Sequence, residues 1–124
     1  MNYFLNISNH PSNTWSEKQL NAAKRYGKVI DIPFPAIPAL YRSEDMRYDV
    51  AVLAEKIRNY INPDHVVTVH IMGEMTFTYM LVDYFRGNDK VTCVASTTQR
   101  MVEEKDGVKI SKFEFVQFRE YCCY

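Results

Sequence analysis

The chain has 124 residues, with 15 basic and 15 acidic side chains and 47% hydrophobic residues, which is the size of one domain with a substantial core. The balanced charge gives no sign of a broad basic surface for long nucleic acid, so we expect no such partner. No stretch approaches the roughly 18 apolar residues of a membrane span, and the N-terminus lacks a secretion signal, so we expect a cytoplasmic protein without membrane partners.

The chain begins with an apolar segment that reads as a strand, residues 2–7. Residues 8–13, Ser-Asn-His-Pro-Ser-Asn, then form a polar loop with strong turn chemistry. Ser16 is followed three residues later by Gln19, which is a capping-box pattern. This pattern predicts a helix over residues 17–26.

A second strand is predicted at residues 28–32, and three prolines shortly after it, at 33, 35 and 38, favour an extended, irregular connection. Ser43 is a candidate cap for the next helix. Apolar residues then recur with helical spacing from Val50 to Ile61, and Asn62-Pro63 ends the helix.

The segment VVTVHIM, residues 66–72, has the near-continuous apolar character of a buried parallel strand, so we expect it at the centre of the sheet. Gly73 then permits a tight turn into a helix over residues 74–86. The free N–H groups at such a helix start attract anions, phosphate among them. Alternatively, Gly73 is only a tight connector.

Gly87-Asn88-Asp89 ends this helix, and residues 91–95 form another apolar strand. Residues 96–100, Ser-Thr-Thr-Gln-Arg, are expected to be a second polar loop. Asp106-Gly107 is a strong hairpin signal between residues 101–105 and 108–118. The apolar residues of the second arm do not alternate cleanly, which predicts a bulge or a bend.

This order of elements predicts an α/β fold: a Rossmann-like parallel sheet with helices on both faces plus a C-terminal antiparallel β-hairpin, in a single domain of residues 1–124. Such sheets bind ligands outside the carboxyl ends of their strands, where the strand order reverses. Three segments are expected to meet there: residues 8–13, 73–76 and 96–100.

These segments supply two candidate catalytic residues. His10 follows a strand end, and its imidazole can act as a general acid or base near neutral pH, or it can simply cap the turn. Glu74 either acts on a substrate or caps the helix that follows it. His70, inside an apolar strand, is interpreted as a core histidine with satisfied hydrogen bonds, and His65 as a surface residue.

The candidate ligand-binding residues are mostly hydroxyl groups, amides and backbone N–H groups from the same segments. They are Ser8, Asn9, Gly73, Met75, Thr76, Ser96, Thr97, Thr98 and Arg100. Arg100 can pair with a phosphate, although an exposed charge at the edge of a hairpin explains it equally well. Trp15 and Met75 either stack on a nucleobase or pack in the core.

No metal or cofactor is expected. These segments hold no group of carboxylates for Mg²⁺, and the phosphate-loop and dinucleotide fingerprints are absent. No G-x-S-x-G elbow is present either. Cys93, Cys122 and Cys123 lack zinc-site spacing, so we expect a buried Cys93 and a reduced terminal pair.

Four segments carry a resemblance to a known family. FLNISNHPSNTWS, KVIDIPFP, VHIMGEMTFTYMLV and VTCVASTTQRMVEEKDGVKISKFEFVQFREY are together similar to the small stand-alone proteins of type III CRISPR loci. These resemble the CRISPR-associated Rossmann fold (CARF) domains, which recognise cyclic oligoadenylates.

The resemblance implies a homodimer that holds a ring-shaped cyclic oligoadenylate across its two-fold axis. It also implies metal-independent ring nuclease activity in antiviral defence, in which a ribose 2′-OH attacks the neighbouring phosphate. The alternatives are a non-catalytic sensor or sponge for the same ligand, and a small nucleotide-binding domain outside CRISPR biology.

Overall fold

A computed structural model describes residues 1–124 and has a mixed α/β fold with one curled, mostly parallel sheet. The strand order is β2-β1-β3-β4-β5. The strands are β1 (Tyr3–Ser8), β2 (Lys28–Asp31), β3 (Val67–Met72), β4 (Val91–Lys105) and β5 (Val108–Glu120), and the helices are α1 (Glu17–Lys24), α2 (Ser43–Arg58) and α3 (Met75–Tyr84). None of these helices is long and apolar enough to cross a membrane.

Residues 66–72 were predicted to form a central parallel strand, and β3 confirms this prediction. β3 pairs in parallel with β1 on one side and with β4 on the other. Within it, His70 is the register partner of Asn6 on β1 and of Val94 on β4.

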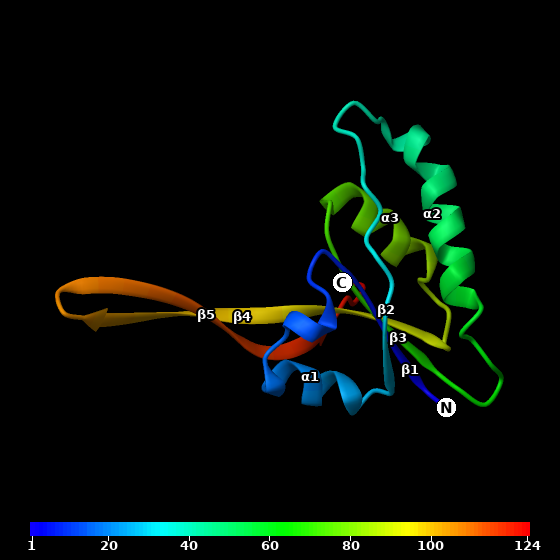
Figure 1. The fold of residues 1–124 in the computed structure, drawn as a ribbon. Helices are drawn as coiled ribbons and strands as arrows, with labels where there is room; N and C mark the ends of the chain where they lie inside the picture. Colours follow the sequence, from blue (N-terminus) through cyan, green and yellow to red (C-terminus); the bar gives the residue numbers. More distant parts are fainter.

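The two faces of the sheet are covered by different helices (Figure 1). On one face, the odd-numbered residues of β1 and β3, such as Leu5 and Val69, form the larger core with α2 and α3. Cys93 belongs to this core and is buried, as expected. On the other face, Phe4 and the β5 residues Phe115 and Phe118 pack around α1. We call this second side the α1 face.

β4 and β5 extend well beyond the body as a two-stranded arm (Figure 1). Residues 96–100, expected to be a loop, are instead part of β4, so this prediction is wrong. The segment is polar because it is exposed, but β5 supplies hydrogen-bonding partners along its whole length, so it remains a strand. The register shifts between Thr97 and Thr98, which pair with Gln117 and Phe115, so the extra residue of the bulge lies in β5, the arm in which the broken alternation led us to expect it.

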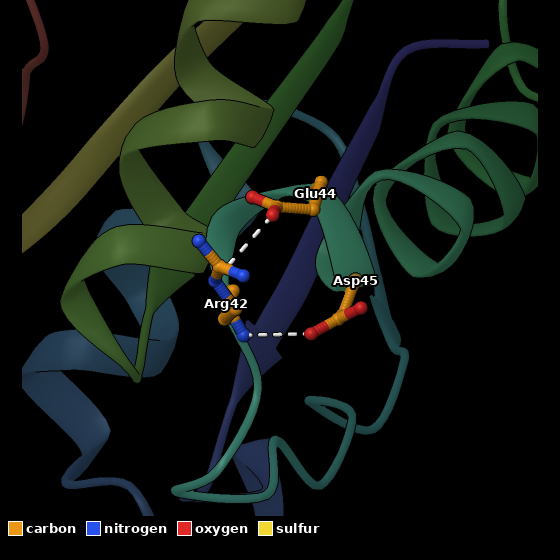
Figure 2. A network of polar contacts seen from close by, with 3 residues as sticks. All are labelled: Arg42, Glu44 and Asp45. Atoms are coloured by element: carbon orange, nitrogen blue, oxygen red, sulfur yellow. Dashed lines mark hydrogen bonds and ion pairs between the residues drawn. The ribbon is translucent and has the colours of Figure 1, made fainter.

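The start of α2 differs from the prediction, because Ser43 is the first helical residue and Arg42 occupies the cap position. Figure 2 shows why: the Asp45 carboxylate accepts a hydrogen bond from the Arg42 N–H at 2.8 Å. The Arg42 guanidinium lies 3.5 Å from Glu44, and both side chains are exposed, so this ion pair contributes little stability. At α1, by contrast, the Ser16 hydroxyl accepts from the Gln19 N–H, as predicted.

Gly73 is required for a reason that the sequence does not reveal. Its φ is not among the positive values found at the three other glycines, so a left-handed turn is not what it provides. Instead, a Cβ atom at this position would overlap the ring of Phe34, which packs edge-on against Phe77 of α3. Gly73 therefore lets the connection from β2 pass close over the turn between β3 and α3.

Candidate functional site

A cleft of about 870 Å³ opens on the α1 face, at the carboxyl ends of β1 and β3 and beside the middle of β4. Its volume lies within the range of small-molecule sites. Its lining residues come from the sheet, the connection between β1 and α1, the start of α1, and β5. They are Ser8, Asn9, His10, Thr14, Trp15, Ser16, Lys18, Gln19, His70, Met72, Gly73, Ser96, Thr98, Phe113, Glu114 and Phe115.

The sheet topology places the cleft. From β1 the chain moves to one side for β2 and then to the other side for β3, so the strand order reverses between β1 and β3. In addition, the β3–β4 ladder ends at the pair His70 and Val94, while β4 continues with β5. Beyond that pair, the Ser96 hydroxyl and N–H contact only the thioether of Met72, a weak acceptor.

A buried polar network, centred on Asn6, forms the base of the cleft. The Asn6 amide nitrogen donates to Asp31 at 2.8 Å and to the His10 carbonyl at 2.9 Å. Its oxygen faces the Ser8 hydroxyl at 2.9 Å and the Nδ1 atom of His70 at 2.8 Å. Asn6 is only 1% exposed, so these bonds satisfy an amide that would otherwise be costly to bury.

Asp31, at the end of β2, connects this network to the loop after β1. Its carboxylate accepts from the Ser12 N–H at 3.0 Å and from the Ser12 hydroxyl at 2.8 Å. Partial burial acts to raise the pKa of Asp31, but the hydrogen bonds from Asn6 and Ser12 outweigh it, so the pKa is lowered. Asp31 is therefore a carboxylate that orders the loop.

The main chain of His10 is held tightly, whereas its ring makes no hydrogen bond. The His10 N–H donates to the Ser8 hydroxyl at 3.2 Å, and its carbonyl accepts from Asn6 and from the Trp15 indole. The exposed imidazole lines the cleft. It is therefore available to a ligand, but no neighbouring side chain orients it.

The side of the cleft formed by α1 carries its positive charge. Lys18 is the one lysine or arginine among the lining residues, and Glu114 is the one carboxylate. Trp15, Phe113 and Phe115 add aromatic surface, and Phe113 is 71% exposed. The site thus combines a cation, hydroxyl groups and aromatic rings, which are the groups that bind phosphates and bases.

The structure brings together six of the residues predicted for the site: Ser8, Asn9, His10, Gly73, Ser96 and Thr98. The other five do not line the cleft. Thr97 exchanges hydrogen bonds with the main chain of Gln117, and Arg100 donates to Ser111 on the arm. Alternation along β4 explains the exclusion of Thr97, because neighbouring side chains of a strand point to opposite faces.

The start of α3 is occupied by a side chain of its own. The Glu74 carboxylate accepts from the N–H groups of Thr76 and Phe77, at 3.2 and 2.8 Å. Hydrogen bonds from the Thr76 hydroxyl and the Phe77 N–H lower the pKa of Glu74. Glu74 therefore acts as the helix cap, which is one of the two roles that the sequence left open, and its carboxylate takes the N–H groups that an anion would need. Met75 is 83% exposed, so it does not pack in the core.

Sequence reasoning missed the start of α1 and the floor residue His70. The signal for α1 was present: the Ser16–Gln19 capping box follows directly after the polar loop at the end of β1. The anion argument that we applied to the start of α3 applies equally to this helix. His70 was interpreted as satisfied, but its Nε2 atom is buried without a hydrogen-bond partner.

The fold and the cleft define an α/β protein with a ligand-sized site at the carboxyl edge of a parallel sheet. The family model described as "Uncharacterized protein MJ1673 family" matches residues 2–119, and the chain belongs to this family. No curated protein and no solved structure matches the chain.

Proposed function

We propose that this protein is a Rossmann-like, CARF-type protein that binds cyclic oligoadenylate in the cleft and cleaves it without a metal ion. The observation that carries the proposal is the convergence of Lys18, His10 and the hydroxyl groups of β4 in one cleft. The resemblance of the four sequence segments to stand-alone proteins of type III CRISPR loci supplies the ligand class.

Binding would use the charge and the aromatic rings. Lys18 pairs with a phosphate of the ring, and the hydroxyl groups of Ser96 and Thr98 donate to phosphate oxygens. Bases stack on the exposed ring of Phe113 or on Trp15. A two-fold dimer presents these groups twice to a symmetric ring.

Cleavage would proceed by attack of a ribose 2′-oxygen on the adjacent phosphorus. A new O–P bond closes a 2′,3′-cyclic phosphate while the bond to the 5′-oxygen of the next nucleotide breaks. His10 takes the proton of the 2′-hydroxyl, and solvent protonates the departing 5′-oxygen. The cleft contributes in-line placement and Lys18 contributes charge stabilisation.

One observation favours the alternative, a non-catalytic sensor or sponge. The His10 ring has no partner that fixes its orientation, and Glu74 lies outside the cleft as a helix cap. A general base must be held within hydrogen-bonding distance of the proton that it takes, and nothing holds this imidazole in one orientation. Ligand binding does not need that orientation.

Purified protein incubated with cyclic tetra- or hexa-adenylate in EDTA, with product separation, tests the two functions. We expect linear products with wild type, and a single-turnover rate roughly 10²-fold lower in His10→Ala with affinity within a few-fold of wild type. His65→Ala, a histidine outside the cleft, is the matched control. Tight binding without cleavage would favour the sensor, and absence of binding would refute both.

A further inference from the structure

His70 is a neutral acceptor whose orientation is fixed by its neighbours. Asn6 must direct its NH₂ group at Asp31 and at the His10 carbonyl, because both can only accept. The Asn6 oxygen therefore faces His70, so Nδ1 of His70 carries the proton and donates. Burial lowers the pKa of His70 to about 4, aided by repulsion from His10, so the ring is neutral at physiological pH.

The Nε2 atom of His70 consequently has a lone pair and no donor. Three aromatic rings surround the imidazole: Phe4 is stacked on it, while Phe118 and Trp15 approach edge-on at 5.3 and 5.5 Å between centroids. The one donor among these rings, the Trp15 indole N–H, is bonded to the His10 carbonyl instead. An acceptor buried without a partner is costly, so its retention calls for an explanation.

The cleft offers that explanation. His70 lines it although the residue is only 2% exposed. Trp15, the neighbour on the cleft side, is held by one hydrogen bond to a carbonyl that also accepts from Asn6. The indole packs edge-on against the imidazole, and its movement would leave the His10 carbonyl still bonded to Asn6.

We propose that Nε2 of His70 accepts a hydrogen bond from a donor group of the bound ligand, and that it makes the cleft selective for ligands with an N–H or O–H there. This inference rests on the proposed function, because it concerns how the same cleft recognises its ligand. In a cyclic oligoadenylate the donor is either the exocyclic amine of adenine or a ribose 2′-hydroxyl. A keto oxygen in place of the amine would face Nε2 with a second acceptor.

The test compares three rings: cyclic tetra-adenylate, its inosine counterpart, which has a keto oxygen in place of the amine, and its 2′-deoxyadenosine counterpart. The hexameric rings are run in parallel. Affinities are measured for wild type, for His70→Phe, and for His65→Phe as the matched substitution outside the cleft. The ¹⁵N resonance of His70 Nε2 is followed in wild type, which keeps the test independent of whether His70→Phe folds.

We expect wild type and His65→Phe to disfavour one analogue by roughly 10- to 100-fold, the cost of an unmade hydrogen bond to a buried group. In His70→Phe the same ratio should fall to within about threefold. The Nε2 resonance should move with the adenylate ring and not with the disfavoured analogue. Discrimination against inosine identifies the amine as donor, and discrimination against the deoxy ring identifies the 2′-hydroxyl.

Two results overturn the inference in different ways. The role of His70 is refuted if the Nε2 resonance does not move and either all three rings bind equally or the discrimination persists in His70→Phe. The proposal that the cleft binds the rings would then still stand. Failure of every ring to bind wild type refutes the proposed function, and the inference falls with it.

Discussion

The hydrogen bond between Asn6 and His70 places two polar side chains inside a parallel sheet, where apolar residues are usual. Each of them is fixed by partners from another strand or loop, so the pair defines both the β1–β3 register and the loop after β1. Polar residues at such positions are costly without a complete set of partners. In this fold the one incomplete member, Nε2 of His70, lies at the cleft.

We predict a characteristic pH dependence of stability from His70. Its pKa is about 4 in the folded protein against 6.5 when unfolded, so between these values the unfolded state binds more protons. Stability is therefore complete above pH 6.5 and falls as the pH drops towards 4, by about 3 kcal/mol. Urea unfolding at pH 7 and pH 4 should show a larger loss for wild type than for His70→Phe. Equal losses would contradict the assignment.

Lys18 should provide the main charge contact with an anionic ligand. Lys18→Met keeps the aliphatic stem but removes the ammonium, so affinity for the cyclic oligoadenylate that binds should fall by about 1.5–3 kcal/mol. The salt dependence of binding should weaken as well. Lys24→Met, at the other end of α1, is the control. Similar losses in both variants would show that only overall charge matters.

Gly73 and Phe34 should be energetically coupled. Gly73→Ala introduces a Cβ that overlaps the Phe34 ring, and overpacking of this kind costs about 1–3 kcal/mol of unfolding free energy. In a Phe34→Ala background the same change should cost much less, because the ring is gone. A double-mutant cycle in urea measures the coupling. Additive effects would mean that the glycine is needed for another reason.

At the scale of elements, the sequence predicted the type of each helix and strand well, but it predicted their first and last residues less well. Strong apolar runs and capping patterns identified all three helices and the parallel strands, because those signals depend on local residues. The segment at 96–100 could not be recognised as strand from its polar residues, since its hydrogen-bonding partner lies in β5. The cleft depends on long-range contacts in the same way. His70 and Lys18 are far apart in the sequence, and only the arrangement of the strands and α1 brings both of them to the cleft.

The start of α3 shows why three of the predicted site residues, Glu74, Met75 and Thr76, do not line the cleft. Three residues had the chemistry of an anion site at α3, but the carboxylate of Glu74 satisfies the N–H groups that an anion would need. At α1 the cap is the neutral Ser16 hydroxyl, and Lys18 follows in the first turn. Sequence alone does not decide between a residue that binds a ligand and one that binds its own helix.

The arm should be dispensable for the stability of the body. The two core clusters include no residue between 100 and 113, and Gln99 and Glu114 are cross-strand partners. Replacing residues 100–113 with Asn-Gly should therefore leave circular dichroism and the urea midpoint close to wild type. A large fall in the midpoint would show that the arm stabilises the body.

At the scale of the whole molecule, we predict a two-fold dimer. The arm exposes Val102, Val108 and Phe113 to solvent, and the α2–α3 side exposes Tyr48 and Tyr79. Where such exposed apolar side chains gather on one surface, they mark a site of contact with another chain. Light scattering at micromolar concentration should give twice the mass of the chain. A monomer, with and without cyclic oligoadenylate, would contradict the dimer and the shared ring site.

The central position of β1 has a kinetic consequence. Its register with β3 joins residues 64 positions apart, such as Asn6 and His70, whereas β4 and β5 are linked by a two-residue turn. Contacts between distant residues close late, because a long intervening chain must first lose its freedom. During synthesis β1 leaves the ribosome before β3, so the edge of β1 that pairs with β3 stays open until residues 67–72 have been made. We therefore expect the arm to form before the sheet, and the passage through a half-built sheet to be the step most exposed to aggregation.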